Sequence, residues 1–466
     1  MKKVFDEVNS LDKKCYDRYA LSEDILMEHA ATSMLDFCEQ NFKKDSKILI
    51  ACGVGNNGAD GITLARLLQS KYNITLFLPF SVNSVMAKLQ LKRANKVDVK
   101  IVNHYSSFDT KYALVVDCLF GSGFKRDLDK QYQKIIKKLN KINAYKLSCD
   151  IPSGINNLGQ ISSVAFKSDT TITMGALKKS LFTDIVKDYV GDIKVANLGV
   201  QRKLYEGDTN CYLLNKKDLK LPFRDIKSTH KGSFGHLSVI IGDKKGAGLL
   251  CAQAGFAFGC GLITAVNTIK EEIKKIPNHI MQSKTIPQNT TALCIGMGLG
   301  DKYDKSYFKN NIPKVIDADL FYDKIILDIL QQDNIVLTPH PKEFCSLLKL
   351  TNIADIDINK LQNNRFKYLS MFSKKYPKIT ILLKGANVLI AQNKKLYINK
   401  FGTSALSKGG SGDVLSGLIG SLLAQGYSTL EATINGSLAH TIAALKYSGN
   451  NYSLTPKELI NQIKKL

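Results

Sequence analysis

The sequence contains no apolar run long enough to cross a membrane. Among its 466 residues, no stretch approaches the roughly 18 apolar positions that a spanning helix requires. The first residues, MKKVFDEVNSLDKKCYDRYA, carry acidic side chains where a secretion signal would have its apolar core. We therefore expect a soluble protein in the cytoplasm, with no membrane partner.

Cysteine pairs with the spacing of a metal or redox site are also absent. The chain has 10 cysteines but no C-x-x-C, and most stand singly in apolar runs such as LIACG, VVDCLFG and ALCIG. Isolated thiols in apolar surroundings are typical of buried, reduced cysteines. The pattern predicts neither a disulfide framework nor a zinc site.

Acidic residues are outnumbered, yet the excess of basic residues lacks the pattern of a nucleic-acid surface. Lys and Arg number 65 against 41 Asp and Glu, which gives a formal net charge of +24. The lysines are scattered, arginines are few, and no basic stripe is interleaved with aromatic residues. We expect a solvated lysine-rich surface that attracts anionic small molecules, and no nucleic-acid partner.

Two alternating series of strands and helices fill the chain. Its length exceeds one ordinary core, so two domains are expected. Short apolar strands that end in Gly, Ser, Asn or Asp alternate with helical patterns, and a polar stretch at 203–229 separates the two series. This alternation predicts an α/β fold with a mainly parallel sheet in each of two domains, 1–208 and 209–466. Ligands of such sheets bind beyond the carboxyl ends of the strands.

A glycine-rich turn, GVGNNGADG at residues 53–61, follows the apolar run KILIAC. Gly53, Gly55 and Gly58 fit the dinucleotide fingerprint, and GITLARLLQ supplies the following helix. The ribose-binding acid expected about 20 positions later is missing, because the next strand ends at Ser81 without Asp or Glu. The turn alone therefore does not indicate a hydride-transfer enzyme, and an Asx-turn is the alternative reading of each asparagine.

The stretch GGSGDVLSGLIGSLLAQG, residues 409–426, predicts an anion-binding helix start. Glycines let backbone N–H groups approach an anion closely, and the positive end of the helix adds to the attraction. Asp413 stands at that start, where a carboxylate can take a proton from an attacking hydroxyl. An N-capping aspartate after a glycine turn is the alternative.

Several further motifs accompany these two in order along the chain. The first half carries GNNGADG, VDCLFGSG, DIPSGI and TMGALK, and the second carries THKGSFGHLSVIIGD, IGMGLG, VIDAD, TPHPKEF and LLKGAN before GGSGD. By these motifs nearly the whole chain resembles the bifunctional NAD(P)H-hydrate repair enzymes, in which an NAD(P)H-hydrate epimerase is fused to an ADP-dependent NAD(P)H-hydrate dehydratase. The resemblance implies an N-terminal Rossmann-like α/β/α sandwich and a C-terminal ribokinase-like α/β/α domain.

The resemblance also implies a chemistry. The family's substrate is a reduced nicotinamide nucleotide hydrated across its C5–C6 double bond. The epimerase interconverts the R and S hydrates at C6. The dehydratase transfers phosphate to the C6 hydroxyl of the S hydrate and then expels it, which yields NADH or NADPH, AMP and phosphate. ADP rather than ATP, Mg²⁺ at the phosphates and K⁺ in the epimerase site are the implied cofactors. The partners are small-molecule substrates, and we expect a homo-oligomer.

Residues of the N-terminal site follow from the same resemblance. The implied hydrate-binding positions are Asn56, Asn57, Gly58, Ala59, Asp60, Gly121, Ser122, Gly123, Phe124, Lys125, Arg126, Asp127, Tyr132 and Asp150. The implied potassium ligands, oxygen donors from three strand ends, are Asn57, Asp117 and Ser153. Asp150 is the candidate proton-transfer residue, whereas Lys178 is expected to be a solvated side chain more than part of the pocket. Ala59 and Leu177 replace a glycine and a proline that are usual in the family.

The C-terminal site is assigned in the same way. The implied hydrate contacts are Ala247, Gly298 or Gly300, His340 and Asp413. The implied nucleotide-binding positions are Lys384, Gly385, Ala386, Asn387, Val388, Gly409, Gly410, Ser411 and Gly412. Asp413 would remove the proton of the C6 hydroxyl. Glu343 is a candidate near the metal, with an acid at a helix start as the alternative.

Two other functions stay open from the residues alone. The second half shares its fold and its G-x-G-D motif with sugar and vitamin kinases, so a small-molecule kinase with an appended nucleotide-binding domain is the main alternative. The first half could also be a binding module that has lost epimerase activity. The presence of Asn57, Asp117, Asp150 and Ser153 argues against that second alternative.

Overall fold

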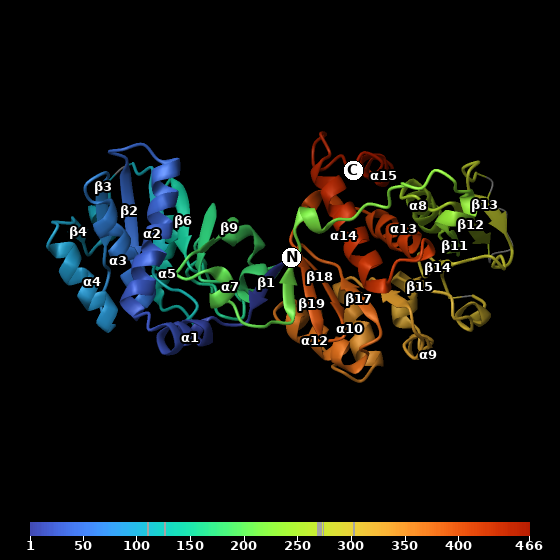
Figure 1. The fold of residues 1–466 in the computed structure, drawn as a ribbon, viewed down its shortest axis with the longest axis horizontal. Coiled ribbons are helices and arrows are strands. Elements are labelled where there is room, and N and C mark those ends of the chain that lie inside the picture. The colour runs from blue at the N-terminus through green and yellow to red at the C-terminus, as the bar shows by residue number, and fades with distance from the viewer. Residues whose placement is uncertain (110, 125–126, 268–272, 274, 302) are drawn as a thin grey trace. The chain divides into compact units, whose positions relative to one another are not determined.

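The computed structural model describes residues 1–109, 111–124, 127–267, 273, 275–301 and 303–466 (Figure 1). The chain forms two compact units, Lys3–Thr209 and Asn210–Leu466, the second of which includes Met1–Lys2. Lys125 and Arg126, assigned above to the N-terminal site, lie outside the described residues. Within the described part, no helix has the length and apolarity needed to cross a membrane.

The N-terminal unit is built on a seven-stranded sheet whose strands all run parallel. In sheet order these strands are β4 (Ile101–Val102), β3 (Asn73–Phe77), β2 (Lys47–Cys52), β5 (Leu114–Cys118), β6 (Tyr145–Cys149), β7 (Thr170–Met174) and β9 (Asp192–Ala196). β1 (Lys2–Phe5) pairs in parallel with β8 (Leu177–Lys178). The central strands are buried on both faces, which explains their continuous apolar sequences.

Helices cover both faces of this sheet (Figure 1). The helices of one face are α2 (Glu23–Asn41), α3 (Asn56–Leu68) and α4 (Val85–Asn95), and α5 (Lys130–Asn140) covers the other. Alternate residues of β2 show the division, because Ile48 and Ile50 pack with the first group and Leu49 and Ala51 with α5. The unit is completed by α1 (Asn9–Tyr19), α6 (Lys187–Val190) and α7 (Arg202–Tyr205).

The C-terminal unit carries a larger, mixed sheet. In sheet order its strands are β13 (Met281–Ser283), β12 (Leu262–Asn267), β11 (His236–Ile241), β14 (Ala292–Ile295), β15 (Lys314–Ile316), β16 (Ile335–Leu337), β17 (Thr380–Leu383), β18 (Val388–Gln392), β19 (Lys395–Asn399) and β10 (Cys211–Leu213). The strands from β13 to β17 are parallel, and β18 is antiparallel to both of its neighbours. The α/β class expected from the alternating pattern is confirmed in both units.

Glycines bring the helix of the GGSGD motif close to its neighbours. The helices that share one apolar cluster with β11 are α8 (Lys245–Ala257), α13 (Ser411–Ala424), α14 (Thr429–Leu445) and α15 (Pro456–Ile463). A Cβ on Gly417 would lie 2.2 Å from the carbonyl oxygen of Cys251, and one on Gly420 would lie 2.3 Å from the Sγ of Cys294. The other helices are α9 (Ile326–Ile329), α10 (Pro341–Leu350), α11 (Ile358–Gln362) and α12 (Arg365–Lys375). All ten cysteines are free and nine are buried, as expected.

Each sheet has one point at which the chain order reverses. In the N-terminal unit the chain runs from β2 outward to β3 and β4 and then returns to the other side of β2 at β5. In the C-terminal unit the same reversal separates β12 and β13 from β14, on either side of β11. Loops that leave the carboxyl ends of strands diverge at such a point, and the crevice between them is where open α/β sheets bind ligands.

Candidate functional site

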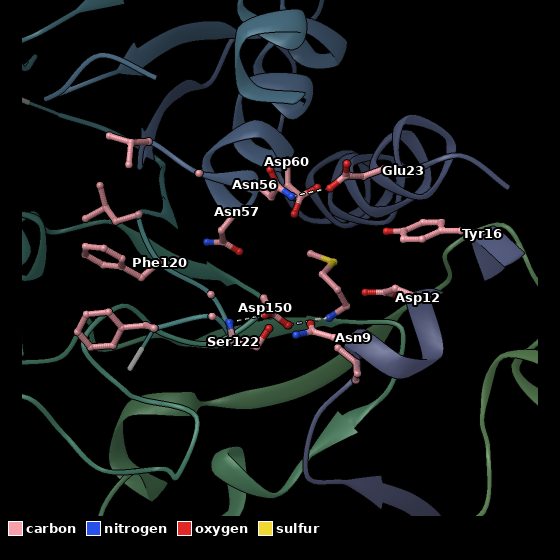
Figure 2. A pocket seen from close by; sticks show the side chains of 18 residues that line it. Asn9, Asp12, Tyr16, Glu23, Asn56, Asn57, Asp60, Phe120, Ser122 and Asp150 are labelled. Carbon is pink, nitrogen blue, oxygen red and sulfur yellow. Dashed lines mark hydrogen bonds between the residues drawn. The ribbon is translucent and has the colours of Figure 1, made fainter. Parts of the chain in front are cut away.

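A cavity of about 760 Å³ lies at the reversal point of the N-terminal sheet (Figure 2). Its walls come from the loops after β2 and β5, the start of α3, the residue after β6, and α1. Polar residues that line it include Asn9, Asp12, Asn57, Asp60, Ser122 and Asp150. Aromatic side chains, among them Tyr16 and Phe120, share the wall, so the cavity suits a small molecule with both polar and apolar parts.

Close backbone packing explains two of the three glycines that match the dinucleotide fingerprint. A Cβ on Gly53 would lie 1.9 Å from the carbonyl oxygen of Leu119, and one on Gly58 would lie 1.9 Å from the carbonyl oxygen of Gly53. A Cβ on Gly55 would have no atom within 4 Å. The match therefore reflects how α3 packs against the turns after β2 and β5, and it does not require a ribose-binding acid.

The asparagines form the first turn of α3, which begins at Asn56 rather than after an open loop. Asn56 donates its Nδ2 to Oε1 of Glu23 at 2.5 Å. The buried Nδ2 of Asn57 has no hydrogen-bond partner within the described residues. A buried amide without a partner costs free energy, so this group is available to a ligand. Ala59 is buried in the core, and its methyl group does not line the cavity.

Asp150 and Lys178 form a buried ion pair beside the cavity. The Lys178 Nζ lies 2.6 Å from Oδ1 of Asp150, and the exposed fractions of the two side chains are 2% for Lys178 and 8% for Asp150. Lys178 also donates to Oγ1 of Thr173 at 2.8 Å and to the carbonyl oxygen of Met174 at 3.0 Å. The expectation that Lys178 is solvated is therefore wrong. β8 pairs with β1, and the Lys178 ammonium lies in the interior, where tertiary packing supplies its three oxygen partners.

The ion pair keeps Asp150 ionised. Burial alone would raise the pKa of Asp150, but the Lys178 ammonium and the N–H groups of Ser122 and Met174 outweigh it and hold the pKa below its ordinary value. The Ser122 N–H donates to Oδ2 at 2.8 Å. Asp150 has a φ of +67°, a left-handed conformation that is uncommon outside glycine. Several contacts thus hold this carboxylate at the end of β6, facing the cavity.

Two further carboxylates face the same cavity, Asp60 from α3 and Asp12 from α1 (Figure 2). Burial raises the pKa of Asp60 well above its ordinary value, and the charges of Asp150 and Asp12 raise it further. Burial also raises the pKa of Asp12, although the Oη of Tyr205 donates a 2.7 Å hydrogen bond to its Oδ1. One ionised carboxylate and two carboxylates with raised pKa values share this space, and such a difference in pKa is what separates a base from an acid in proton transfer.

Two of the expected potassium ligands are in direct contact. Asp117, fully buried at the end of β5, accepts the Oγ of Ser153 on Oδ1 at 2.6 Å and the N–H of Ser153 on Oδ2 at 2.7 Å. Burial raises the pKa of Asp117 to about 6 despite these donors. No cationic side chain among the described residues pairs with Asp117, so a monovalent cation would compensate its charge. Asn57 lies on the cavity wall, where its Oδ1 is 2.7 Å from the Cβ position of Gly121.

The second hydrate-binding segment, residues 121–127, lies only partly on the cavity. Gly121, Ser122, Gly123 and Phe124 line it. Asp127 is exposed, and it accepts a 3.1 Å hydrogen bond from the Oγ of Ser162. The ring of Tyr132 is buried, and its centroid lies 4.5 Å from the centroid of the Phe120 ring and 4.8 Å from that of the Phe80 ring. Tyr132 therefore supports the wall through Phe120.

In the C-terminal unit, an ammonium and two carboxylates meet at the start of α13. Gly410, with a φ of +89°, precedes this helix, and Asp413 lies in its first turn. The Lys384 Nζ is 3.2 Å from the Cβ position of Gly412 and 2.7 Å from Oδ1 of Asp317. Burial raises the pKa of Asp413 to about 6, to which the charge of Asp317 also contributes, while Lys384 opposes the rise. The arrangement presents N–H groups, an ammonium and a nearby base to an anion.

A buried arginine shapes the segment 384–388. Arg365 is 1% exposed, and it donates to the carbonyl oxygens of Leu383 at 3.2 Å and of Lys384 and Asn387 at 3.0 Å. The planar guanidinium thereby fixes three carbonyl groups of one loop at once. The Lys384 ammonium is thus presented from a rigid turn between β17 and β18. Gly385 and Ala386 lie at the tip of that turn.

His340 and Glu343 cap α10 reciprocally. The Nδ1 of His340 accepts the N–H groups of Lys342 at 3.1 Å and Glu343 at 3.2 Å, and Oε2 of Glu343 accepts the His340 N–H at 2.7 Å. Burial lowers the pKa of His340 and raises that of Glu343 to about 7. Glu343 therefore caps the start of α10, which was the alternative to a role near the metal. Its second oxygen, Oε1, lies 3.1 Å from Nε2 of His340.

The remaining hydrate-contacting candidates gather at the reversal point of the C-terminal sheet. A Cβ on Gly298 would lie 3.4 Å from that of Ala247 and 2.6 Å from that of Lys244. Gly298 and Gly300 have φ values of +59° and +75°, which favour glycine. The Gly300 N–H donates to Oδ2 of Asp319 at 3.0 Å, and both residues line a cavity of about 270 Å³.

Comparison with known proteins matches both units. A family model described as YjeF-related protein N-terminus matches residues 23–180, and one described as NAD(P)H-hydrate dehydratase matches residues 237–465. The Bifunctional NAD(P)H-hydrate repair enzyme Nnr of Helicobacter pylori is 43% identical over 473 residues, which cover 100% of both chains. The protein of the same name from Dictyoglomus turgidum is 32% identical over 98% of this chain and 96% of its own.

Solved structures give a similarity confined to one part of the chain. The ADP/ATP-dependent NAD(P)H-hydrate dehydratase from Bacillus subtilis, co-crystallized with ATP/Mg²⁺, is 24% identical. It covers 55% of this chain and 98% of its own, with a TM-score of 0.47.

Proposed function

The chain belongs to the family of bifunctional NAD(P)H-hydrate repair enzymes, and we propose that its two units carry out the two reactions of that family in series. The N-terminal unit epimerises the hydrates of NADH and NADPH at C6, and the C-terminal unit dehydrates the S hydrate with ADP. One observation carries the proposal. Each unit places an acid–base carboxylate and anion-binding groups beyond the carboxyl ends of its strands, Asp150 with Asn57 in one and Asp413 with Lys384 in the other.

In the N-terminal site, Asp150 is the base. The ion pair with Lys178 keeps it ionised at neutral pH, so it can accept a proton from the oxygen at C6. The free amide of Asn57 and the N–H groups at the start of α3 offer donors to the polar groups of the nucleotide. The hydrogen bond between the Ser122 N–H and Asp150 holds the loop after β5 against the base.

In the C-terminal site, Asp413 is the base. A pKa near 6 leaves it largely ionised at neutral pH, so it accepts the proton of the C6 hydroxyl as that oxygen attacks the terminal phosphorus of ADP. The N–H groups at the start of α13 and the Lys384 ammonium stabilise the negative charge on the transferring phosphoryl group. The bond between C6 and oxygen then breaks as the lone pair of the ring nitrogen forms an N–C6 double bond and phosphate leaves, and loss of a proton from C5 to water restores the C5–C6 double bond.

Three cofactors complete the proposal, and contacts among the described residues support one of them, K⁺, directly. K⁺ fits the uncompensated carboxylate of Asp117 with Ser153 and Asn57, where it would hold three strand ends in register. Mg²⁺ would neutralise the charge of the phosphates, and it is proposed from family resemblance because both carboxylate oxygens of Glu343 already contact His340. ADP is proposed over ATP from family resemblance. We propose further that the protein acts in the cytoplasm, on small molecules, as a homo-oligomer.

Two substitutions separate the activities. With pure S hydrate, ADP and Mg²⁺, Asp413→Asn should lower recovery of dihydropyridine absorbance by about 100-fold or more while epimer interconversion persists. Asp150→Asn should dehydrate the S hydrate normally and leave the R hydrate unrepaired. If the wild-type protein instead releases a stable phosphorylated product from a sugar or vitamin, and does not restore the dihydropyridine, the small-molecule kinase is the correct function.

A further inference from the structure

We propose that Asp12 is a second catalytic residue of the N-terminal site, a proton donor that works with Asp150 and is positioned by Tyr205. The inference rests on the proposed epimerase function. Neither Asp12 nor Tyr205 lies in the segment that the N-terminal family model matches, residues 23–180. Both lie in the compact unit Lys3–Thr209, one on α1 and the other at the end of α7.

The geometry places one oxygen of Asp12 at the disposal of a substrate. Asp12 lines the cavity, and Figure 2 shows its side chain pointing into the space that Asp150 enters from another wall. The Oη of Tyr205 donates to Oδ1 of Asp12 at 2.7 Å. A protonated Asp12 that accepts this bond on Oδ1 carries its own proton on Oδ2, the orientation that a general acid needs.

Tyr205 is held in place by close packing. Its side chain is buried, and a Cβ on Gly175 would lie 2.2 Å from the Tyr205 Oη. The hydroxyl therefore fits only because residue 175 has no side chain. The Asp12 carboxylate is thus oriented by a rigid donor, as a positioned catalytic group must be.

The charge balance of the cavity also favours a proton on Asp12. Three carboxylates, those of Asp12, Asp60 and Asp150, act on one another around the buried ammonium of Lys178. Lys178 pairs directly with Asp150, and burial raises the pKa of Asp12 and of Asp60, which favours their protonated forms. The titratable groups that interact electrostatically with Asp12 are Glu7, Cys15, Tyr16, Asp60, Asp150, Lys178 and Tyr205.

The chemistry uses the two carboxylates in turn. Asp12 gives its proton to the C6 hydroxyl, the C6–O bond breaks, and the lone pair of the ring nitrogen forms a C6–N double bond as water leaves. A water molecule then adds to C6 from the other face, and Asp150 takes its proton. One water molecule leaves and one is added, no group is oxidised or reduced, and the reverse reaction or solvent returns the proton to Asp12. Inversion at C6 therefore needs an acid and a base, and both face this cavity.

Asp12→Asn in the full-length protein tests the proton donor directly. Asparagine keeps the acceptor for Tyr205 but has no proton to give. The rate of interconversion of the R and S hydrates should fall by about 100-fold or more, with KM nearly unchanged. Asp12→Glu should restore part of the rate, and dehydration of the S hydrate by the C-terminal unit is the internal control. Interconversion at the wild-type rate in Asp12→Asn would overturn the proposal.

Tyr205→Phe gives a readout that a merely structural role would not move. The Tyr205 hydrogen bond lowers the pKa of Asp12, so its loss raises that pKa. Asp12 must be protonated to donate its proton. The alkaline limb of the pH–rate profile for epimerisation should therefore move to higher pH in this variant. Tyr19→Phe is the matched control, since the Oη of Tyr19 also bridges α1 and α7 by donating to the Leu204 carbonyl oxygen at 3.2 Å.

The outcomes are distinguishable. If the alkaline limb of the pH–rate profile for epimerisation lies at the same pH in Tyr205→Phe as in the wild type, the positioning role of Tyr205 is contradicted, even if the variant is less stable to heat. If the wild-type protein interconverts the hydrates and Asp12→Asn does so equally well, Asp12 has no catalytic role although the proposed function stands. If the wild-type protein itself does not interconvert them, the proposed epimerase function fails.

Discussion

Lys384 and Asp317 form an ion pair of 2.7 Å that joins the proposed nucleotide-binding segment after β17 to the acid after β15. The Oγ of Ser416, in α13, donates to the other oxygen of Asp317 at 2.8 Å. One carboxylate therefore ties three elements together around the ammonium that faces the helix start, and its charge acts on Asp413 as well.

Asp317→Asn should change both nucleotide binding and the pH dependence of dehydration. Asparagine still accepts from Ser416, but Lys384 loses a charge-assisted hydrogen bond worth roughly 1.5–3 kcal/mol, so the KM for ADP should rise about 10-fold or more. Because the charge of Asp317 raises the pKa of Asp413, the acid limb should move to lower pH. Steady-state kinetics over a pH series measure both effects. Asp328→Asn, at an exposed position, is the control. An unaltered KM for ADP in Asp317→Asn would contradict the role of Asp317 in holding Lys384 for the nucleotide.

Dehydration of the S hydrate should fall as the pH drops through about 6. Burial raises the pKa of Asp413 to about 6, and only the ionised carboxylate accepts the proton of the C6 hydroxyl. Below that pH, kcat/KM should decrease about 10-fold for each further pH unit. Initial rates with pure S hydrate at saturating ADP give the profile. A rate that stays constant down to about pH 5 would exclude Asp413 as the base.

Lys178→Met should abolish epimerisation and destabilise the N-terminal unit. Removal of the ammonium leaves Asp150 buried without its counter-charge, which raises its pKa so that it is protonated at neutral pH. Loss of one partner of a buried pair costs about 3–5 kcal/mol of folding free energy. Epimer interconversion and thermal unfolding measure the two effects.

Lys179→Met provides the matched control for that experiment. Lys179 is the neighbouring lysine, and it forms an ion pair with Asp6. The exposed fraction of the Asp6 side chain is 79%. An exposed pair contributes about 0–1 kcal/mol, so this variant should remain active and stable. Equal losses in the two variants would show that the Lys178–Asp150 pair has no special role.

Potassium should stabilise the wild-type protein and support its epimerisation. A cation beside Asp117 compensates a buried carboxylate whose pKa is raised to about 6 by burial. Thermal unfolding and R-to-S interconversion are compared in potassium and tetramethylammonium chloride at equal ionic strength. Asp117→Asn should remove the dependence on potassium in both readouts. A stabilisation by potassium that persists in Asp117→Asn would place the cation elsewhere.

The sequence predicted the α/β class and the polar ends of strands because both follow from local patterns. Apolar runs with alternating helical stretches specify strands and helices, and Asp150 and Asp413 stand where a strand ends or a helix begins. The first turn of α3 was harder to predict, since glycine and asparagine at residues 53–61 indicate a turn. The helix begins at Asn56, five residues before the expected start at Gly61, because packing against the turns after β2 and β5 stabilises it.

Residues brought together by tertiary packing could not be predicted. Asp12 and Tyr205 are 193 positions apart, and no periodicity in either segment indicates their hydrogen bond. Lys178 and Lys179 are adjacent in the sequence, and only the structure shows that Lys178 is buried whereas Lys179 is half-buried. Asp317 lies in VIDAD, where its place after an apolar strand was the one available signal of a site residue.

An equilibrated mixture of R and S NADH hydrates, supplied with ADP, Mg²⁺ and K⁺, tests the two-reaction account most directly. Dihydropyridine absorbance, AMP and phosphate are followed together after the full-length protein is added. The account predicts complete recovery of both epimers, with AMP and phosphate formed in amounts equal to the NADH restored. Recovery that stops when the S hydrate is consumed would contradict epimerisation by the N-terminal unit, and the absence of recovery would contradict the repair function as a whole.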